Sequence, residues 1–167
     1  PTLGETFVVI GLGLLGQLTT QILKANGCRV IGTDHDLHRI QLAQKLGIDH
    51  AFNASDSDVL AQLQKISAGY GADGVIITAA TASSEVVSTA FEMSRRKGRV
   101  VLVGDVGLDL NRADMYAKEL DFFISTTCFL TLIGILLSEA NFAEPKYSSF
   151  TPYSLEIFLN SPSIISI

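Results

Sequence analysis

The chain has 167 residues, 47% of them hydrophobic, and carries a formal net charge of −5 at pH 7. It is long enough for one domain with a core of its own, or for one domain and an appendage. The acidic balance argues against a surface that binds duplex nucleic acid. The longest basic run, Arg95-Arg96-Lys97, is interpreted as a solvated helix end before Gly98.

The two cysteines, Cys28 and Cys128, lie far apart in the sequence, and no CxxC pair is present. Neither a zinc knot nor a disulfide framework is therefore indicated. Residues 1–5 are typical of a linker and contain no basic-then-apolar leader. We therefore expect a reducing, cytoplasmic setting rather than secretion.

Strand-like runs alternate with helical patterns along most of the chain. Hydrophobic periodicity and glycine stops predict, in chain order, strand 7–10, helix 13–25, strand 29–33, helix 36–46, strand 50–53, a helix from 55 that the glycines of 69–74 end, strand 75–79, helix 84–93, strand 99–103 and, after a loop and a short helix, strand 120–125. Strand 75–79 is apolar on both faces, which is typical of a central parallel strand. The alternation predicts an α/β fold with a six-stranded parallel Rossmann sheet, doubly wound in the order 3-2-1-4-5-6.

Apolar residues recur near the helical period in the first three predicted helices. Ser55 is expected to begin the third helix, with Asp58 as its capping partner. The apolar sets are Leu14, Leu15, Leu18, Ile22 and Ala25 on the first helix, Leu37, Ile40, Ala43 and Leu46 on the second, and Val59, Leu60, Leu63 and Ile66 on the third.

The C-terminal part of the sequence has a different character. Residues 128–137 form a continuous apolar run, and with 122–127 they make 16 uncharged residues. A membrane-spanning helix needs about 20 apolar residues, so a buried helix is favoured over a membrane segment. We expect a Rossmann domain over residues 1–127, and an apolar segment followed by a poorly ordered tail over 128–167.

Three glycines follow the first predicted strand in the pattern GxGxxG and open the first helix, which is the context that dinucleotide binding requires. Gly11 allows the tight turn, Gly13 lets the backbone approach a pyrophosphate, and Gly16 lets the helix pack closely on the strand. The backbone N–H groups at the helix start then face the anion. The N–H groups expected to take part belong to Leu12, Leu14 and Leu15.

An acidic residue at the end of the second strand is the second requirement of such a site. Asp34 follows Gly16 by 18 residues, and its carboxylate can accept hydrogen bonds from both hydroxyls of the adenosine ribose. It would repel a 2′-phosphate, which favours NAD over NADP, although His35, His38 and Arg39 nearby could hold a phosphate. The alternative is that Asp34 only caps the second helix.

No other group of residues in the sequence forms a recognisable catalytic or metal-binding pattern. Tyr116 and Lys118 are two residues apart, whereas a short-chain dehydrogenase needs Tyr and Lys four apart on one helix face. His35 and His38 lack a third metal ligand at suitable spacing, and a solvated helix start explains them better. The sequence offers no pair of nucleophile and base, and we assign no catalytic residue.

Five stretches carry a resemblance to a known family. They are residues 4–34, "RIQLAQKLGIDHAFN" (39–53), "YGADGVIITAA" (70–80), "KGRVVLVGDVG" (97–107) and "KELDFFIST" (118–126). Together they resemble the cofactor-binding domain of medium-chain dehydrogenases, the zinc-type alcohol and threonine dehydrogenase-like group. "GLGLLGQL" and "VVLVGDVGLD" are most similar to the dehydrogenase half of two-part oxidoreductases.

This resemblance implies further residues of the cofactor site. Arg39 occupies the place of a basic residue that contacts the adenosine ribose. Thr78 and Ala79, at the end of the fourth strand, lie beside the cofactor. Val103 and Gly104, at the end of the fifth, contribute backbone groups that meet the nicotinamide amide.

The family's catalytic zinc ligands and proton relay lie mainly in a separate barrel-like domain. We expect that domain, and with it any zinc, to be absent from this chain. Residues after 126 do not resemble the family's continuation, as if the reading frame or the protein fragment had changed, or as if they were a lineage-specific extension.

The resulting prediction is the NAD-binding domain of an alcohol-dehydrogenase-like oxidoreductase, which by itself binds the cofactor without catalysis. Its partners would be the nicotinamide dinucleotide and a catalytic domain or second oxidoreductase module, but neither nucleic acid nor a membrane. A homo-oligomer is left open. Two alternatives stay open: a non-enzymatic nucleotide-sensing regulatory domain of a transport system, and an inactive dehydrogenase remnant.

Overall fold

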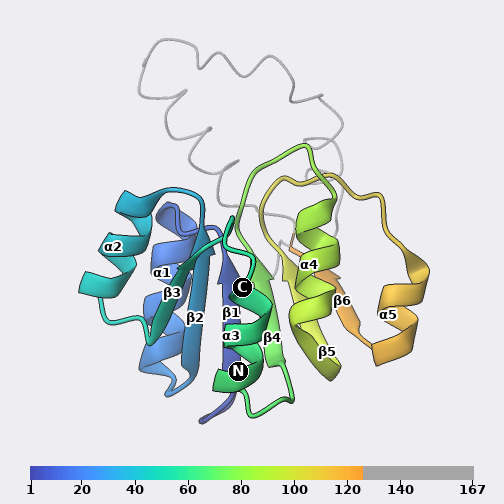
Figure 1. Cartoon of the computed structure of the whole chain (residues 1–167), viewed down its shortest axis with the longest axis horizontal. Coiled ribbons are helices and arrows are strands. Elements are labelled where there is room, and N and C mark those ends of the chain that lie inside the picture. The colour runs from blue at the N-terminus through green and yellow to red at the C-terminus, as the bar shows by residue number, and fades with distance from the viewer. Residues whose placement is uncertain (126–167) are drawn as a thin grey trace, which may run out of the picture. The chain divides into compact units, whose positions relative to one another are not determined.

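A parallel sheet in the order β3-β2-β1-β4-β5-β6 organises the computed structural model, which describes residues 1–125 (Figure 1). This order confirms the predicted doubly wound α/β fold. The strands of the described residues are β1 (Thr6–Ile10), β2 (Arg29–Asp34), β3 (His50–Asn53), β4 (Ala72–Ile77), β5 (Ser94–Leu102) and β6 (Asp121–Ile124). The helices are α1 (Leu14–Ala25), α2 (Leu37–Lys45), α3 (Val59–Ile66), α4 (Glu85–Met93) and α5 (Arg112–Lys118).

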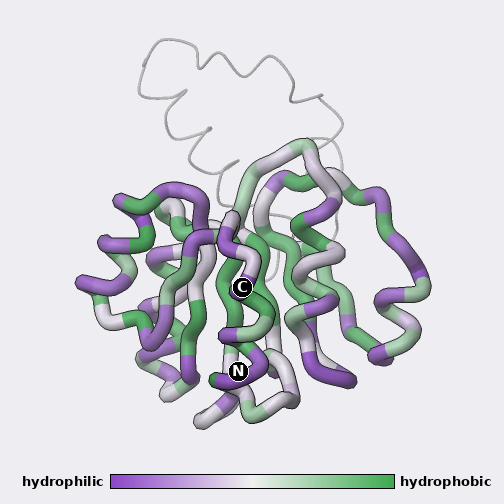
Figure 2. Tube along the Cα trace, in the orientation of Figure 1, coloured by the Kyte–Doolittle hydropathy of each residue, from purple (hydrophilic) through white to green (hydrophobic). Residues whose placement is uncertain are grey.

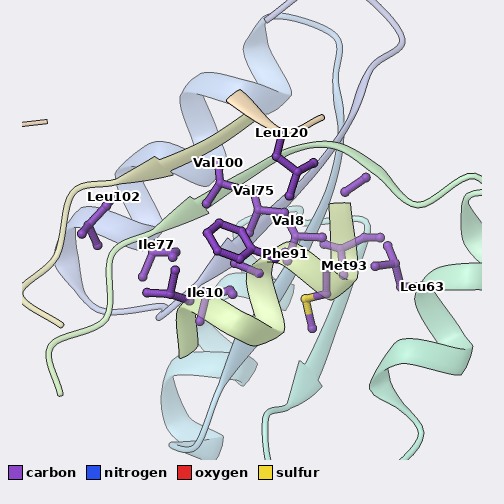
Figure 3. Packing of buried hydrophobic residues seen from close by; sticks show 14 of the residues in the cluster. Val8, Ile10, Leu63, Val75, Ile77, Phe91, Met93, Val100, Leu102 and Leu120 are labelled. Atoms are coloured by element: carbon purple, nitrogen blue, oxygen red, sulfur yellow. The ribbon is translucent and has the colours of Figure 1, made fainter. Parts of the chain in front are cut away.

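Helices bury both faces of the sheet. On one face, α1 and α2 pack against β1 and β2 through Leu23, Ile40 and Ala43. On the other, α3 and α4 lie in front of the sheet in Figure 1, and their residues Leu63 and Phe91 join the larger hydrophobic cluster of Figure 3. Figure 2 shows the central strands as hydrophobic, with hydrophilic residues on the surrounding helices and loops. The paired strand register places the carboxyl ends of β1, β2, β4 and β5 along one edge.

Helix α1 turns a different face to the sheet from the one that the predicted apolar set indicated. Leu14 and Ile22 are 78% and 61% exposed, whereas Gly16, Gln17, Thr20 and Leu23 are buried. The reason is the close approach of Gly16 to the preceding turn, which fixes the rotation of α1 about its axis. The inward positions 16, 20 and 23 follow the helical spacing from that contact.

The third helix begins later than predicted, at Val59 rather than Ser55. The side chain of Asn53 accepts a hydrogen bond from Ser55 N–H at 2.9 Å, which favours a turn over a helix at this point. Asp58 occupies the cap position, but within the described residues its side chain makes no capping hydrogen bond. The proposed pairing of Ser55 with Asp58 as a capping box was therefore wrong.

The basic triplet 95–97 lies in β5 and does not end a helix, so that interpretation was wrong. α4 ends at Met93, and Ser94 is already extended with ψ 143°. Arg95 Nε donates to Asp73 Oδ1 at 2.6 Å, and Arg96 pairs with Glu119. These ion pairs hold the triplet against β4 and the end of α5.

Two predictions concern segments beyond this part of the structure. The apolar segment and tail at 128–167, and with them the proposed domain boundary at 127, lie outside the described residues. Within residues 1–125, no helix has the length and apolar character needed to cross a membrane.

Asp73 joins three strands at the opposite, amino edge of the sheet. Its Oδ2 accepts Thr6 N–H of β1 at 2.8 Å, and its Oδ1 accepts Arg95 Nε of β5 at 2.6 Å. Burial raises the pKa of the Asp73 carboxyl, but these hydrogen bonds and the charge of Arg95 outweigh burial and bring the pKa below its ordinary value. The carboxylate therefore stabilises the fold most when it is ionised.

We predict that Asp73→Asn lowers the free energy of unfolding at pH 7 and that the loss disappears in acid. A folded-state pKa below the unfolded one contributes stability that is complete above the unfolded pKa of about 4 and is lost as the pH falls through the folded value. Urea denaturation of both proteins across the pH range measures this. A loss of stability that is as large at about pH 2 as at pH 7 would contradict it.

We predict that Phe91→Ala lowers the free energy of unfolding by about 3–5 kcal/mol. Phe91 is 1% exposed, and its ring meets that of Phe122 edge-on with centroids 5.7 Å apart. The matched control is Phe123→Ala on β6, where the side chain is 53% exposed and the loss should stay below about 1 kcal/mol. Urea denaturation at neutral pH compares them, and equal losses would contradict the assigned core.

Candidate cofactor site

Four segments meet at the carboxyl edge of the sheet, where open α/β sheets bind ligands. Gly11–Gly16 follow β1, Asp34 ends β2, and Thr78 and Val103 begin the loops after β4 and β5. Direct hydrogen bonds join them. Gly11 N–H donates to Thr33 O at 2.8 Å and Thr78 N–H to Ile10 O at 2.8 Å, so the predicted site residues form one continuous rim.

The glycine turn depends on space that side chains would fill. Gly11 has φ +95°, and a Cβ there would lie 2.7 Å from Ala79 N. A Cβ on Gly16 would collide with the Gly11 carbonyl oxygen. At Gly13, by contrast, no atom of the described residues lies within 4 Å of an added Cβ. The first and third glycines therefore serve packing, and the second faces open space.

Thr78 fastens this turn to β4. Its hydroxyl donates to Gly11 O at 2.6 Å and lies 3.2 Å from Ile10 O. Ala79, the next residue, forms the wall against which Gly11 packs. Both residues thus lie beside the turn, and Thr78 shapes it through its side chain.

Backbone hydrogen bonds also hold the loop after β5 against the end of β4 and the loop that follows it. Val103 and Gly104 N–H both donate to Ile77 O at 2.9 Å, and Thr81 N–H donates to Asp105 O at 2.8 Å. A Cβ on Gly104 would collide with Ala79 O. The loops after β4 and β5 therefore extend the sheet edge as one unit beside the glycine turn.

Asp34 is 8% exposed and already accepts two backbone hydrogen bonds. Its Oδ2 accepts Leu12 N–H at 2.6 Å, and its Oδ1 accepts Asp36 N–H at 2.8 Å. The expectation that Leu12 N–H faces an anion is corrected here, because Asp34 takes that donor. At the start of α1, Leu14 and Leu15 keep N–H groups that have no partner within the helix.

The residue that caps α2 is Asp36, and not Asp34 as the alternative interpretation of the sequence had it. The side chain of Asp36 accepts a hydrogen bond from His38 N–H at 2.8 Å and thereby caps the helix. The guanidinium of Arg39 lies 3.6 Å from Asp34 Oδ2 and 3.7 Å from Asp36 Oδ2. Its side chain is 54% exposed, so it flanks Asp34 from the solvent side.

Gln17 is a site residue that the sequence did not reveal. Its Nε2 donates to Leu12 O at 3.0 Å and to Arg39 O at 2.9 Å. It therefore joins the glycine turn to the segment that carries Arg39. A glutamine after GxGxxG has no distinguishing spacing, and only the rotation of α1 shows that it faces inward.

With this geometry in place, comparison with known proteins assigns the family. The sequence model of the zinc-binding dehydrogenase family matches residues 15–136. The chain belongs to this family. The resemblance to the cofactor-binding domain of medium-chain, zinc-type dehydrogenases is thereby confirmed.

The relatives that match this chain include both NAD-dependent and NADP-dependent oxidoreductases. The NAD-dependent alcohol dehydrogenase of Sulfurisphaera tokodaii is 36% identical over 108 residues, which are 64% of this chain and 30% of that protein. The NADP-dependent oxidoreductase RED1 of Cochliobolus heterostrophus is 27% identical over 152 residues, 89% of this chain and 42% of that one. The chain thus spans well under half the length of these relatives.

Solved structures of the family share the fold. The alcohol dehydrogenase of Aeropyrum pernix superposes with a TM-score of 0.67 at 26% identity, over 83% of this chain and 40% of that one. Alcohol dehydrogenase TADH from Thermus sp. ATN1 gives a TM-score of 0.68 at 24% identity, over 82% of this chain and 40% of that one.

Among residues 1–125, no three His, Cys, Asp or Glu side chains are grouped to hold a metal ion.

We predict that two alanine substitutions in the glycine turn destabilise the protein to different extents. Gly16→Ala should lower the free energy of unfolding by about 1–3 kcal/mol, because the new methyl group would collide with backbone. Gly13→Ala should lower it by at most about 1 kcal/mol, since the position is open and only the preference of a helix N-cap for Gly over Ala is lost. Denaturant titration of both proteins measures the difference. Equal effects would show that the close approach of α1 to the turn is misassigned.

Proposed function

We propose that residues 1–125 bind NAD and serve as the cofactor domain of an alcohol-dehydrogenase-like oxidoreductase. The observation that carries the proposal is the pairing of an open glycine turn with a buried carboxylate at the end of the next strand. Within a family of dehydrogenases, these two features mark where the pyrophosphate and the adenosine ribose would bind.

The pyrophosphate would lie at the start of α1. Gly13 offers open space, and the N–H groups of Leu14, Leu15 and Gly16 lie in the first turn of the helix, where no earlier carbonyl can accept them. The positive end of the helix dipole adds to the attraction for a dianion. Gly11 shapes this turn without contacting the ligand, and Gly16 would contact it only through its N–H group.

The adenosine ribose would bind to Asp34. Each of its carboxylate oxygens accepts one backbone N–H, and a carboxylate has about four acceptor positions, so each oxygen can still accept a ribose hydroxyl. The negative charge opposes a 2′-phosphate, which supports NAD. Arg39, at 3.6 Å from Asp34, partly offsets that charge, and the NADP-dependent relative shows that the family accommodates both cofactors.

The nicotinamide would lie beside the loops after β4 and β5. Ala79, Val103 and Gly104 would provide backbone groups there, and Thr78 would keep the turn in place. When bound, the nicotinamide ring accepts or donates the hydride, while the protein supplies orientation and electrostatics. In the complete enzyme, a hydride would pass from the carbon of an alcohol to NAD, or back to the carbon of the corresponding carbonyl compound, with a catalytic domain or a second oxidoreductase module holding the substrate.

We propose that this chain alone binds the cofactor and turns over no alcohol. The sequence contains no recognisable pair of acid and base, and the chain matches only the cofactor portion of its relatives. The relatives reported above are alcohol dehydrogenases and an oxidoreductase, so we do not retain the transport-sensor alternative. Alcohol oxidation by the purified chain with NAD and without a partner chain would refute this.

We predict that Asp34→Ala weakens NAD binding about ten- to hundredfold, because hydrogen bonds to a charged group are lost, and weakens NADP binding much less. Isothermal titration calorimetry with both cofactors measures the two affinities. The matched control is Asp36→Ala, which removes a nearby carboxylate that caps α2 and should reduce both affinities about equally. Equal loss of both cofactors in Asp34→Ala would contradict the ribose role.

A further inference from the structure

Gln17 lies in the second turn of α1 and is 7% exposed. Its side-chain amide donates one hydrogen bond to Leu12 O at 3.0 Å and another to Arg39 O at 2.9 Å. The first acceptor is in the glycine turn, and the second is on α2, beside the carboxylate of Asp34. One side chain thus connects the two parts of the proposed cofactor site.

Both backbone polar groups of Leu12, the N–H and the carbonyl, are hydrogen-bonded to side chains. Its N–H donates to Asp34 Oδ2 at 2.6 Å, and its carbonyl accepts from Gln17. Its side chain is fully buried. The residue between the first two glycines therefore has no freedom to rotate unless one of these hydrogen bonds breaks.

The carbonyl of Leu12 and the N–H of Gly13 belong to the same peptide unit. Because a trans peptide is planar, its C=O and N–H point in opposite directions. A carbonyl directed at the buried Gln17 amide therefore directs the Gly13 N–H away from it, at a residue where the described part of the chain leaves open space. Glycine at 13 makes rotation of this peptide easy, so the orientation depends on what holds the carbonyl.

Stability alone does not explain Gln17. Its Oε1 is buried and has no hydrogen-bond partner among the described residues. A buried acceptor without a partner lowers stability, and an apolar side chain of similar shape would avoid that cost. The amide is therefore better explained by what its two N–H bonds hold in place.

We propose that Gln17 is a positioning residue for cofactor binding. It fixes the Leu12–Gly13 peptide so that the Gly13 N–H is presented to the pyrophosphate, and it ties this turn to the Asp34 and Arg39 segment that receives the adenosine ribose. The role rests on the proposed NAD binding. It predicts that Gln17 matters most for ligands that contact both parts of the site at once.

The test compares Gln17→Leu and Gln17→Glu with the parent protein. Both variants remove the two N–H donors, and ionised Glu also repels the two carbonyls. Calorimetry with NAD should show a loss of about tenfold or more in affinity, as expected for hydrogen bonds lost from a preorganised site. Adenosine, followed by NMR titration, contacts only the Asp34 side and should lose less than about threefold. The matched control is Gln21→Leu, one helical turn further on, where the glutamine is exposed and neither affinity should change.

A second readout needs no ligand. In ¹⁵N NMR spectra of the unliganded chain, Gln17→Leu should shift the Gly13 amide resonance and speed its hydrogen exchange, whereas Gln21→Leu should not. Parent protein that binds no NAD would refute the proposed function, while an altered Gly13 amide would still support the peptide lock. An unchanged Gly13 amide, or equal losses of NAD and adenosine affinity, would overturn the role of Gln17.

Discussion

The close approach of α1 to the turn after β1 is the contact on which the rest of the site depends. Gly16 lies so near the Gly11 carbonyl that any side chain would collide with it. This contact sets the rotation of α1, and with it which residues face the sheet. Gln17 is thereby turned inward, and Leu14 and Ile22 are turned outward. The same contact leaves the first turn of the helix at the carboxyl edge, where its N–H groups can meet an anion.

Asp34 connects this turn to the second strand. A carboxylate that is 8% exposed needs hydrogen-bond donors, and it finds them in the N–H groups of Leu12 and Asp36. The same group that would recognise a ribose thus also holds the glycine turn. Together with Gln17, it restrains Leu12 from both sides, so that the site is preorganised before a ligand arrives. Preorganisation of this kind lowers the entropy lost on binding.

Hydrophobic periodicity was sufficient for the order and type of the elements, because alternation of apolar runs with helical patterns leaves few topologies open. It was less reliable where local hydrogen bonds compete. Asn53 makes a turn that delays α3 to Val59, and the triplet 95–97 lies in β5, where Arg95 and Arg96 form ion pairs with Asp73 and Glu119. On α1, the predicted apolar set gave the wrong face, since a glycine contact that hydropathy does not detect governs the packing.

The sequence by itself determined the α/β class, the glycine turn and the acid after the second strand, because short-range spacing specifies each of them. The tertiary structure decided which donors those groups meet. It assigned Leu12 N–H to Asp34, the cap of α2 to Asp36, and the inward position to Gln17. These assignments depend on how α1 and α2 are rotated against the sheet, and that rotation follows from contacts between segments distant in the chain.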